Sequence, residues 1–420
     1  MSDKFLLKGG TVLTLGAKTP NFPVADVLVE GGVITEVGQG LRGRDAEVID
    51  ATNTIVMPGF VDSHRHVSRS LLRNEGDQAV SAGGYGPDDV YASTLVGLLG
   101  ALESGITTVV DWSDIEEDDG HSEAALQAHS DSGLRTVFVH SDPAALGGVT
   151  QRAGLTTPAF KTYLPPNDAR GSVAGEWAAA RETGLRIHLH AGVDSSERGL
   201  VAAMGDGGHL GSDVTLVHCS NLDPADLDAI SSTGSMVALT PSSEMSHGIG
   251  APPVQEFLDR KIRPGLGVDN EWSGQGDMFA QMRAAISLQH ATYFDLKLAG
   301  KGGLPNLLST REVIRWATVD GARVAGLDKV TGPLAPGMQA DIVLLRTDRP
   351  NIFPINDPIG AVVWGMDTSN IDWVFVGGKP LLSNGVVGAD VARARGLAAA
   401  ALGRVGRPAN AVDIRQEVAG

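Results

Sequence analysis

Two histidines separated by a single residue stand at the end of an apolar stretch near the start of the chain. They are His64 and His66, in the sequence PGFVDSHRH of residues 58–66. Alternate residues of a β-strand point to the same face, so both imidazoles can reach one cation. Neutral imidazole suits zinc, iron and related metals. A bare HxH pair is weak evidence, but the buried strand predicted before it favours a metal site over a chance pair on an exposed strand.

Three later segments have the same form, an apolar strand that ends in a polar residue. Their sequences are IHLHAG, LVHCS and GLGVD, and the residues at their strand ends are His190, His218 and Asp269. His188 shares a face with His190, but His190 is nearer the C-terminal end of its strand and is the favoured ligand. A packed or hydrogen-bonded role stays open for His188. One strand-end aspartate is usually a helix cap, whereas this series of histidines and an aspartate indicates a shared site.

The middle of the chain, about residues 58–331, alternates between strands and helices. One helix is marked by Tyr91, Leu95, Leu98 and Leu102, which fall on one helical face. Strands are expected at residues 105–110, 136–139, 186–190, 214–218, 236–239 and 263–268. Roughly eight such units predict a (β/α)8 barrel of the TIM type, more than an open doubly wound sheet. Barrel enzymes place their sites at the C-terminal ends of the strands, where the polar residues would meet.

Two β-rich segments bracket this middle part. Short strands are expected at residues 5–15, 24–29 and 33–37, and again at residues 341–345, 361–363 and 373–376. The simplest arrangement is one small β-sandwich made from both chain ends. We therefore predict that residues 1–57 form its first part, residues 58–331 the barrel, and residues 332–420 its second part with a C-terminal helix.

The bulk composition narrows the range of partners. The 420 residues are 42% apolar and 20% charged, which predicts a large buried core, and the net charge of −17 disfavours nucleic acids and anionic membranes. Cys219 is the single cysteine, so no intrachain disulfide can form. The N-terminus lacks the features of a signal peptide, and no stretch approaches the ~20 apolar residues of a membrane helix. We expect a cytoplasmic protein that acts on a small molecule.

The polar strand ends are accompanied by motifs that resemble the amidohydrolase superfamily over nearly the whole chain. The motifs are KGGTV at residues 8–12, PGFVDSHRH at residues 58–66, ATVDGA at residues 317–322 and GPLAPGMQADIV at residues 332–343. The chain is most similar to the branch that contains cytosine deaminase, the triazine hydrolases and S-adenosylhomocysteine deaminases. The resemblance also implies assembly into a homo-oligomer.

By this resemblance, one divalent metal is held by His64, His66, His190 and Asp269, with zinc first and iron or manganese as alternatives. His218 either hydrogen-bonds the metal-bound water or binds a second metal, and we assign it the first role. The metal lowers the pKa of its water to about 7, and the resulting hydroxide attacks an sp2 carbon. Asp269 is placed to take the water proton and pass it to the leaving nitrogen, so His218 and Asp269 are the predicted catalytic residues.

The leading prediction for the reaction is hydrolysis of a C–N bond, namely deamination of an amino-substituted N-heterocycle. The alternative is hydrolysis of a cyclic amide, or of another ring substituent, without release of ammonia. A non-catalytic metal-binding protein is a third class, which the complete ligand set disfavours.

One position departs from the pattern of the resemblance. Many deaminases of this branch carry a glutamate three residues after the histidine of strand five, whereas this chain has Val193. Valine cannot move protons, so another acid such as Glu244 or Glu271 does this work, or none is needed there. Glu244 and His247 lie in the sequence PSSEMSHG just beyond a predicted strand end, and we predict that both bind substrate. An ordinary solvated loop is the alternative for these two residues.

Lys161 and two arginines leave further alternatives open. The sequence FKTY around Lys161 resembles the strand of hydantoinase-type enzymes, whose carboxylated lysine bridges two metals. In that case His190 and His218 would hold a second metal, although an ordinary lysine beside a strand is favoured. Arg69 and Arg73 lie in a loop that could cover the site and hold an anionic group, but solvated arginines are the simpler interpretation.

Overall fold

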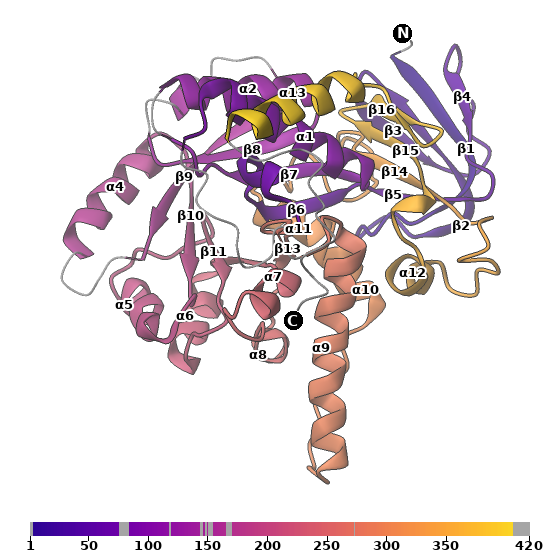
Figure 1. The fold of residues 1–420 in the computed structure, drawn as a ribbon. Coiled ribbons are helices and arrows are strands. Elements are labelled where there is room, and N and C mark those ends of the chain that lie inside the picture. Colours follow the sequence, from indigo (N-terminus) through magenta and orange to yellow (C-terminus); the bar gives the residue numbers. More distant parts are fainter. Residues whose placement is uncertain are drawn as a thin grey trace, which may run out of the picture.

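The computed structural model describes residues 3–74, 84–116, 119–142, 146–147, 149, 154–164, 170–272 and 274–405. Part of the predicted covering loop that contains Arg69 and Arg73, and the end of the part predicted at residues 332–420, lie outside these ranges. Figure 1 shows a barrel with helices around it and, beside it, a β-rich part that contains strands from both ends of the chain. Among the described residues, no helix is long and apolar enough to cross a membrane.

Eight parallel strands follow one another in chain order around the barrel. They are β6 (Phe60–Arg65), β7 (Ile106–Trp112), β8 (Arg135–His140), β9 (Thr156–Tyr163), β10 (Arg186–Ala191), β11 (Val214–His218), β12 (Met236–Leu239) and β13 (Gly265–Leu266). The ring closes just past β13, where the Asp269 amide donates to the His64 carbonyl at 2.8 Å and the His66 amide donates to the Asp269 carbonyl at 2.7 Å. This closure confirms the predicted (β/α)8 barrel.

Helices of the βα units surround the strands (Figure 1). They are α1 (Pro87–Glu103), α2 (Asp119–Ser132), α4 (Arg170–Glu182), α5 (Leu200–Asp206), α6 (Pro224–Thr233), α7 (Pro241–Ser246), α8 (Val254–Asp259), α9 (Met278–Leu298), α10 (Thr310–Trp316) and α11 (Val319–Val324). The predicted apolar face of α1 is confirmed, since Leu95, Leu98 and Leu102 are buried. Inside the barrel, Val110 and Val137 pack with Ala322 of α11, which lies at the N-terminal ends of the strands.

A second, mainly antiparallel sheet has nine strands from both ends of the chain. They are β1 (Lys4–Val12), β2 (Phe22–Glu30), β3 (Val33–Gly38), β4 (Glu47–Asp50), β5 (Thr54–Pro58), β14 (Ile342–Arg346), β15 (Ile371–Val376), β16 (Lys379–Ser383) and β17 (Val386–Val387). The pairing of β5 with β14 joins the two ends, with Met57 opposite Val343. Their shared core includes Phe5 and Phe375, whose ring centroids lie 5.5 Å apart. The predicted β-sandwich part is therefore confirmed.

One predicted strand is wrong. Residues 361–363 belong to the π-helical turn η4 (Ala361–Gly365), which continues the short helix α12 (Pro358–Gly360). The Asp357 side chain accepts hydrogen bonds from the amides of Ile359 and Gly360, so it caps a helical turn before the apolar residues begin. Their burial therefore reflects helical packing and not a strand. The predicted C-terminal helix is confirmed as α13 (Val391–Arg404), which packs against α1.

Two features join the barrel to the β-sandwich part. Gly59 separates β5 from β6, and a Cβ atom at this position would lie 2.2 Å from the Thr107 side chain, so a larger residue would be excluded. Across the junction, the buried Arg135 at the start of β8 forms an ion pair with Asp341 at 2.7 Å. The strand β6, which leads to the site histidines, therefore starts at a tightly packed position.

Candidate active site

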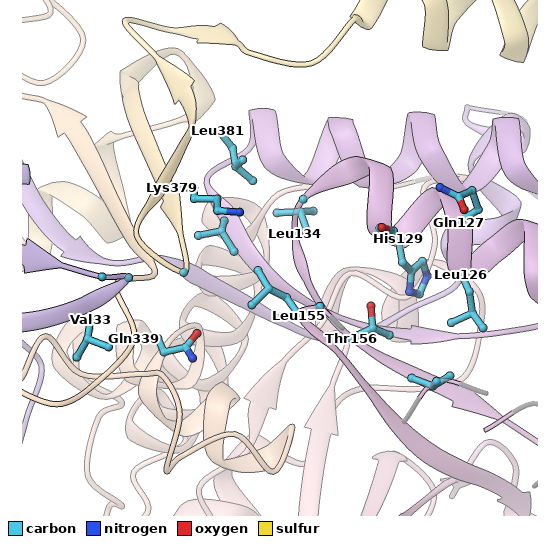
Figure 2. A pocket seen from close by; sticks show the side chains of 18 residues that line it. Val33, Leu126, Gln127, His129, Leu134, Leu155, Thr156, Gln339, Lys379 and Leu381 are labelled. Carbon is cyan, nitrogen blue, oxygen red and sulfur yellow. The ribbon is translucent and has the colours of Figure 1, made fainter. Parts of the chain in front are cut away.

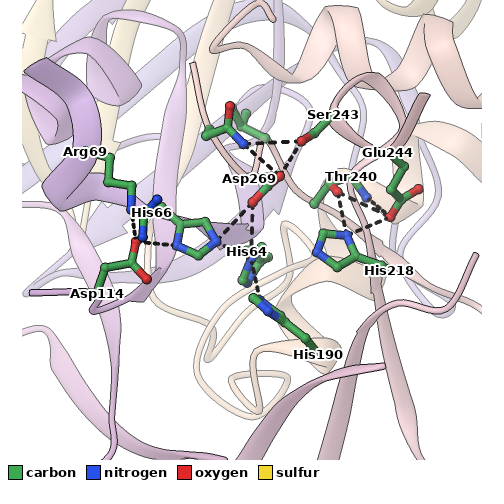
Figure 3. A network of polar contacts seen from close by, with 12 residues as sticks. His64, His66, Arg69, Asp114, His190, His218, Thr240, Ser243, Glu244 and Asp269 are labelled. Atoms are coloured by element: carbon green, nitrogen blue, oxygen red, sulfur yellow. Dashed lines mark hydrogen bonds and ion pairs between the residues drawn. The ribbon is translucent and has the colours of Figure 1, made fainter. Parts of the chain in front are cut away.

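The four predicted metal ligands converge at the C-terminal end of the barrel (Figure 3). The Nε2 atom of His64 lies 3.1 Å from Nε2 of His66 and 3.3 Å from Nε2 of His190. Asp269 Oδ1 lies 3.0 Å from His66 Nε2 and 3.5 Å from His64 Nε2. We call these four residues the metal cluster. The structure thus brings together side chains from β6, β10 and the segment after β13.

The donor set of the metal cluster fits one divalent cation. Ligand atoms that bind the same ion at about 2.0–2.2 Å lie roughly 3–3.5 Å from one another, which matches these separations. His66 Nδ1 lies 2.7 Å from Asp114 Oδ2, so a proton on Nδ1 leaves the Nε2 lone pair for a metal. Without a cation, three imidazole nitrogens would face one another in a buried place with a single carboxylate oxygen between them.

Burial and neighbouring charges act differently on the imidazoles. Burial lowers the pKa of His64 to about 4 and lowers the pKa of His190 well below its usual value, which keeps both rings neutral and able to act as ligands. Burial also lowers the pKa of His66, but the carboxylates of Asp114 and Asp269 outweigh it and raise the value to about 10. A cation at this place would therefore displace a proton from His66.

The second oxygen of Asp269 is held by two side chains. Ser243 Oγ donates a short hydrogen bond to Oδ2, and Asn270 Nδ2 donates to the same atom at 2.9 Å. Asp269 has φ of 67° and His218 has φ of 74°, both in the left-handed region that non-glycine residues rarely adopt. Such backbone strain is concentrated at functional sites. The orientation of Asp269 is thus fixed both by its backbone and by its hydrogen bonds.

His218 lies beside the metal cluster and is held from behind. Its Nδ1 atom lies 3.1 Å from Thr240 Oγ1 and 3.2 Å from Glu244 Oε1. With the proton on Nδ1, its other nitrogen can accept a hydrogen bond at the cluster, where His64, His190 and His218 have ligand atoms within 4.8 Å of one another. The structure thus brings His218 next to the metal cluster, and its role toward a metal-bound water stays a prediction.

The structure corrects the role predicted for Glu244. Its side chain is fully buried and its Oε1 accepts a hydrogen bond from the Thr240 amide at 2.9 Å, so it faces His218 from behind and not the substrate side. Burial raises the pKa of its carboxyl, against the opposing effect of His218. The helix α7 that starts at Pro241 turns this residue back toward β11, which the loop interpretation did not anticipate.

His247, the other predicted substrate residue, is half-buried at the rim. Its Nδ1 lies 2.9 Å from Ser243 Oγ, which also bonds to Asp269, so His247 is linked to the metal cluster through one hydroxyl group. The Trp272 ring lies 5.8 Å from its ring, and the Arg69 guanidinium lies over the Trp272 ring at 5.3 Å from its centroid. These side chains form one side of the rim.

Two other candidates are engaged in ion pairs. Lys161 Nζ lies 2.7 Å from Glu116 Oε1 and donates to the Ser113 carbonyl, so its amine already has a partner carboxylate. Glu271 Oε1 lies 3.0 Å from Arg65 Nη2, and its Oε2 lies 2.8 Å from Arg73 Nε. Neither Glu271 nor Arg73 is a freely solvated group.

Arg65 also pairs with the buried Asp62 at 3.1 Å. We call the four residues Asp62, Arg65, Glu271 and Arg73 the ion-pair cluster. Its members lie close to metal ligands in the sequence, yet each is paired with an oppositely charged side chain of the same cluster. Their function is therefore to hold the end of β6 against the segment after β13.

Sequence reasoning missed several residues that support the site. Asp114 binds both His66 and Arg69, and Trp112 stacks on the His190 ring with centroids 4.2 Å apart and planes at 13°. Asp114 follows the end of β7 by two residues, so the strand-end rule that identified the other residues could have found it. The contact of Ser243 with Asp269 had no such signal, because it depends on how α7 packs.

A cavity lined by described residues lies at the other end of the barrel. It has a volume of about 780 Å³ and is lined in part by Leu134 and Thr156 at the starts of β8 and β9, and by Val33 and Gln339 of the β-sandwich part (Figure 2). No residue of the metal cluster lines it. Since barrel chemistry occurs at the C-terminal strand ends, the metal cluster and not this cavity is the candidate active site.

Comparison with known proteins identifies the family. Residues 55–381 match the Amidohydrolase family. The chain belongs to this family. Among curated relatives, the 5′-deoxyadenosine deaminase of Methanosarcina mazei is 28% identical over 91% of this chain and 94% of the relative. The 5-methylthioadenosine/S-adenosylhomocysteine deaminase of Pelotomaculum thermopropionicum is 29% identical over 90% of this chain and 93% of the relative.

Solved structures show the same fold. An adenosine deaminase from Xanthomonas campestris with bound zinc has a TM-score of 0.80 at 21% identity, over 96% of this chain and 98% of that chain. An atrazine chlorohydrolase from Arthrobacter aurescens, complexed with zinc, has a TM-score of 0.81 at 22% identity, over 95% and 100%. The predicted family is confirmed, and the deaminase names of its curated relatives support the predicted reaction class, the metal-dependent hydrolysis of a C–N bond.

Proposed function

We propose that this amidohydrolase removes the 6-amino group from an adenine nucleoside that is modified at its 5′ position. The observation that carries the proposal is the convergence of three imidazole nitrogens and one carboxylate oxygen beside His218. That arrangement belongs to a chain that matches 5′-deoxyadenosine and 5-methylthioadenosine/S-adenosylhomocysteine deaminases over about nine-tenths of its length. The triazine hydrolases are similar in fold alone.

We assign one divalent cation, zinc, to the metal cluster. The donor separations of 3.0–3.5 Å support one ion, and the pairing of Lys161 with Glu116 disfavours the carboxylated lysine that a second metal would need. When bound, such a cation would lower the pKa of a water in the site to about 7 and so supply a nucleophile at neutral pH.

The side chains around the cation divide the remaining work. Asp269 would take a proton from the attacking water and pass it to the leaving amine, with its carboxylate held still by Ser243 and Asn270. His218 would accept a hydrogen bond from the water and so direct it, because Glu244 and Thr240 hold its Nδ1. His247 at the rim would contact the substrate. Preorganised partners of this kind cost no rearrangement during the reaction.

The test is a substrate screen with the purified, zinc-loaded protein. The panel contains adenosine, 5′-deoxyadenosine, 5-methylthioadenosine and S-adenosylhomocysteine, together with cytosine, guanine, an aminotriazine and a cyclic amide. Ammonia release and product mass are scored together. We expect ammonia and replacement of an amino group by oxygen with the 5′-modified adenosines. A product that has gained one water without ammonia would select the cyclic-amide alternative, and silence with fully metallated protein would contradict the proposal.

A further inference from the structure

The N-terminal end of the barrel holds a cluster with more positive than negative charge. Asp320 of α11 is buried there, and three guanidinium groups lie around it. Its carboxylate oxygens lie 3.5 Å from Arg263 Nη1, 3.5 Å from Arg315 Nε and 3.8 Å from Arg323 Nε. Ion pairs that are also hydrogen-bonded are shorter, at about 2.7–2.9 Å. One carboxylate is therefore shared among three cations, and none of them holds it closely.

Arg323 of α11 keeps hydrogen-bond donors that the protein does not fully satisfy. Its Nε atom is buried and has no hydrogen-bond partner among the described residues. Its Nη1 donates at 3.3 Å to the thioether of Met236, a weak acceptor, and its Nη2 donates to the Arg263 carbonyl. Burial, and then the charges of neighbouring arginines, lower the pKa of this guanidinium by more than nearby carboxylates raise it. The group has no close counter-charge of its own.

A small cavity lies beside this guanidinium, and we call it the anion cavity. It has a volume of about 90 Å³, and its polar lining consists of Ser231, Ser235, Lys261, Arg263 and Arg323. None of its lining residues is acidic. The volume is that of roughly three waters and so suits one phosphate or sulfate ion. Three cationic side chains around a space of this size favour a small oxyanion as the occupant.

The end of helix α6 also borders the anion cavity, and it accounts for only part of the positive charge. Gly234, a lining residue, is the C-cap of this helix. The carbonyl end of a helix is equivalent to about half a negative charge. Against this half charge and the single shared carboxylate stand four cations, namely Lys261 and the three arginines around Asp320. A positive surplus therefore remains, in a chain whose net charge is −17.

We propose that the anion cavity binds a tetrahedral oxyanion, either inorganic phosphate or the phosphate group of a small monoester. Lys261, Arg263 and Arg323 supply the donors. The bound anion ties α11, whose Ala322 packs inside the barrel, to the segment that precedes β13. The inference goes beyond the proposed function and does not depend on it, because the anion cavity and the metal cluster lie at opposite ends of the barrel.

Titration calorimetry on the zinc-loaded protein tests the proposal. The titrants are inorganic phosphate and glycerol 3-phosphate, with sodium chloride at matched ionic strength as the control for screening. We expect saturable binding of phosphate and none of chloride. Arg323→Met and Lys261→Met should weaken the binding by about 10- to 100-fold, the range of a hydrogen bond to a charged group. Lys8→Met is the matched control and should keep the wild-type Kd, because Lys8 is an exposed lysine of β1 outside the cavity.

Two further measurements keep the test decisive. Lys261 is exposed, so Lys261→Met reports on the cavity even if Arg323→Met fails to fold. Phosphate at ten times its Kd should raise the thermal midpoint of the wild type by about 1–2 °C and leave that of Lys261→Met unchanged. His190→Ala, which alters the metal cluster, should bind phosphate as tightly as the wild type does.

The outcomes decide both the site and the source of the anion. Tighter binding of glycerol 3-phosphate would support a monoester as the occupant, and equal or tighter binding of inorganic phosphate would support the free ion. Unchanged affinity in Arg323→Met and Lys261→Met would overturn the proposal, and so would the absence of saturable binding. Binding that disappears in His190→Ala would also overturn it and place the anion at the metal cluster. No readout uses turnover, so failure of the proposed function leaves this test intact.

Discussion

Two buried polar clusters share two segments of the chain, the end of β6 and the stretch after β13. The metal cluster adds His190 from β10, and the ion-pair cluster adds Arg73. In the ion-pair cluster, Asp62 and Glu271 face Arg65 and Arg73 at 2.8–3.1 Å, so each buried charge has a counter-charge from the protein. In the metal cluster, one carboxylate faces three imidazoles, and donor atoms point at one another.

The difference shows which cluster needs a ligand. Buried charges are stable only when they are paired or bound to a metal. The ion-pair cluster meets this condition within the protein, so it should fold in the same way with or without a cation. The metal cluster does not, so its stability and its chemistry should both depend on what binds there. Five changes test this contrast, from the largest expected effect to the smallest.

Removal of a metal ligand should disrupt the metal cluster and leave the ion-pair cluster intact. We expect His190→Ala to lose bound metal and to lower turnover by more than about 100-fold, because even indirect partners of a metal cost ~10- to 100-fold. The barrel should stay folded, since the ion-pair cluster is intact. Metal analysis and ammonia release measure the two effects, and full metal content in the variant would contradict the assignment of His190.

Replacement of Arg65 should lower the stability of the folded protein. Its guanidinium is buried between Asp62 and Glu271, so Arg65→Met leaves Asp62 without its partner and Glu271 with Arg73 alone, and it should lower the free energy of unfolding by about 3–5 kcal/mol. Denaturant unfolding of the metal-free protein measures this. Arg73→Met is the control, because Arg73 is 29% exposed and its pair should contribute no more than about 1 kcal/mol. Equal losses of unfolding free energy in the two variants would mean that burial does not decide how much these ion pairs stabilise the protein.

Removal of the metal by a chelator should lower the thermal midpoint of the wild-type protein. A ligand at 100 times its Kd stabilises the folded state by roughly 2.7 kcal/mol, and this contribution disappears on chelation. The midpoint of His190→Ala should not respond to the chelator. A chelator-sensitive midpoint in that variant would place the stabilising cation elsewhere in the molecule.

Glu244→Gln tests whether Glu244 positions His218 or supports metal binding. The buried carboxylate holds His218 Nδ1 and no metal ligand, so kcat should fall by about 10- to 100-fold while metal content stays at the wild-type level. Metal analysis and steady-state kinetics on the same preparation test this. Loss of the metal together with the activity would make Glu244 a support of the metal cluster itself.

Lys161→Met should have the smallest effect and decides between one metal and two. Because Lys161 is paired with Glu116, we expect the metal content to stay near one ion per chain and kcat to change by only a few-fold. A fall from two ions to one, measured by metal analysis of wild type and variant, would restore the second-metal alternative.

Much of the fold was predictable because periodicity and strand ends are local signals. The barrel, the paired chain ends and the buried face of α1 all follow from such patterns, and so do the positions of His64, His190 and Asp269 at strand ends. The prediction of a strand at residues 361–363 was wrong because three apolar residues are too few to distinguish the periodicity of a strand from that of a helix. The capping carboxylate of Asp357 made it helical instead.

The sequence alone determined which residues stand at the mouth of the barrel, because alternation along a strand and the order of βα units are properties of neighbours in the chain. Only the tertiary structure decided which atoms face one another. His66 and Asp269 are about two hundred residues apart and meet because the ring closes between them. Glu244 likewise lies behind His218 because of contacts between different strand ends that no local pattern records.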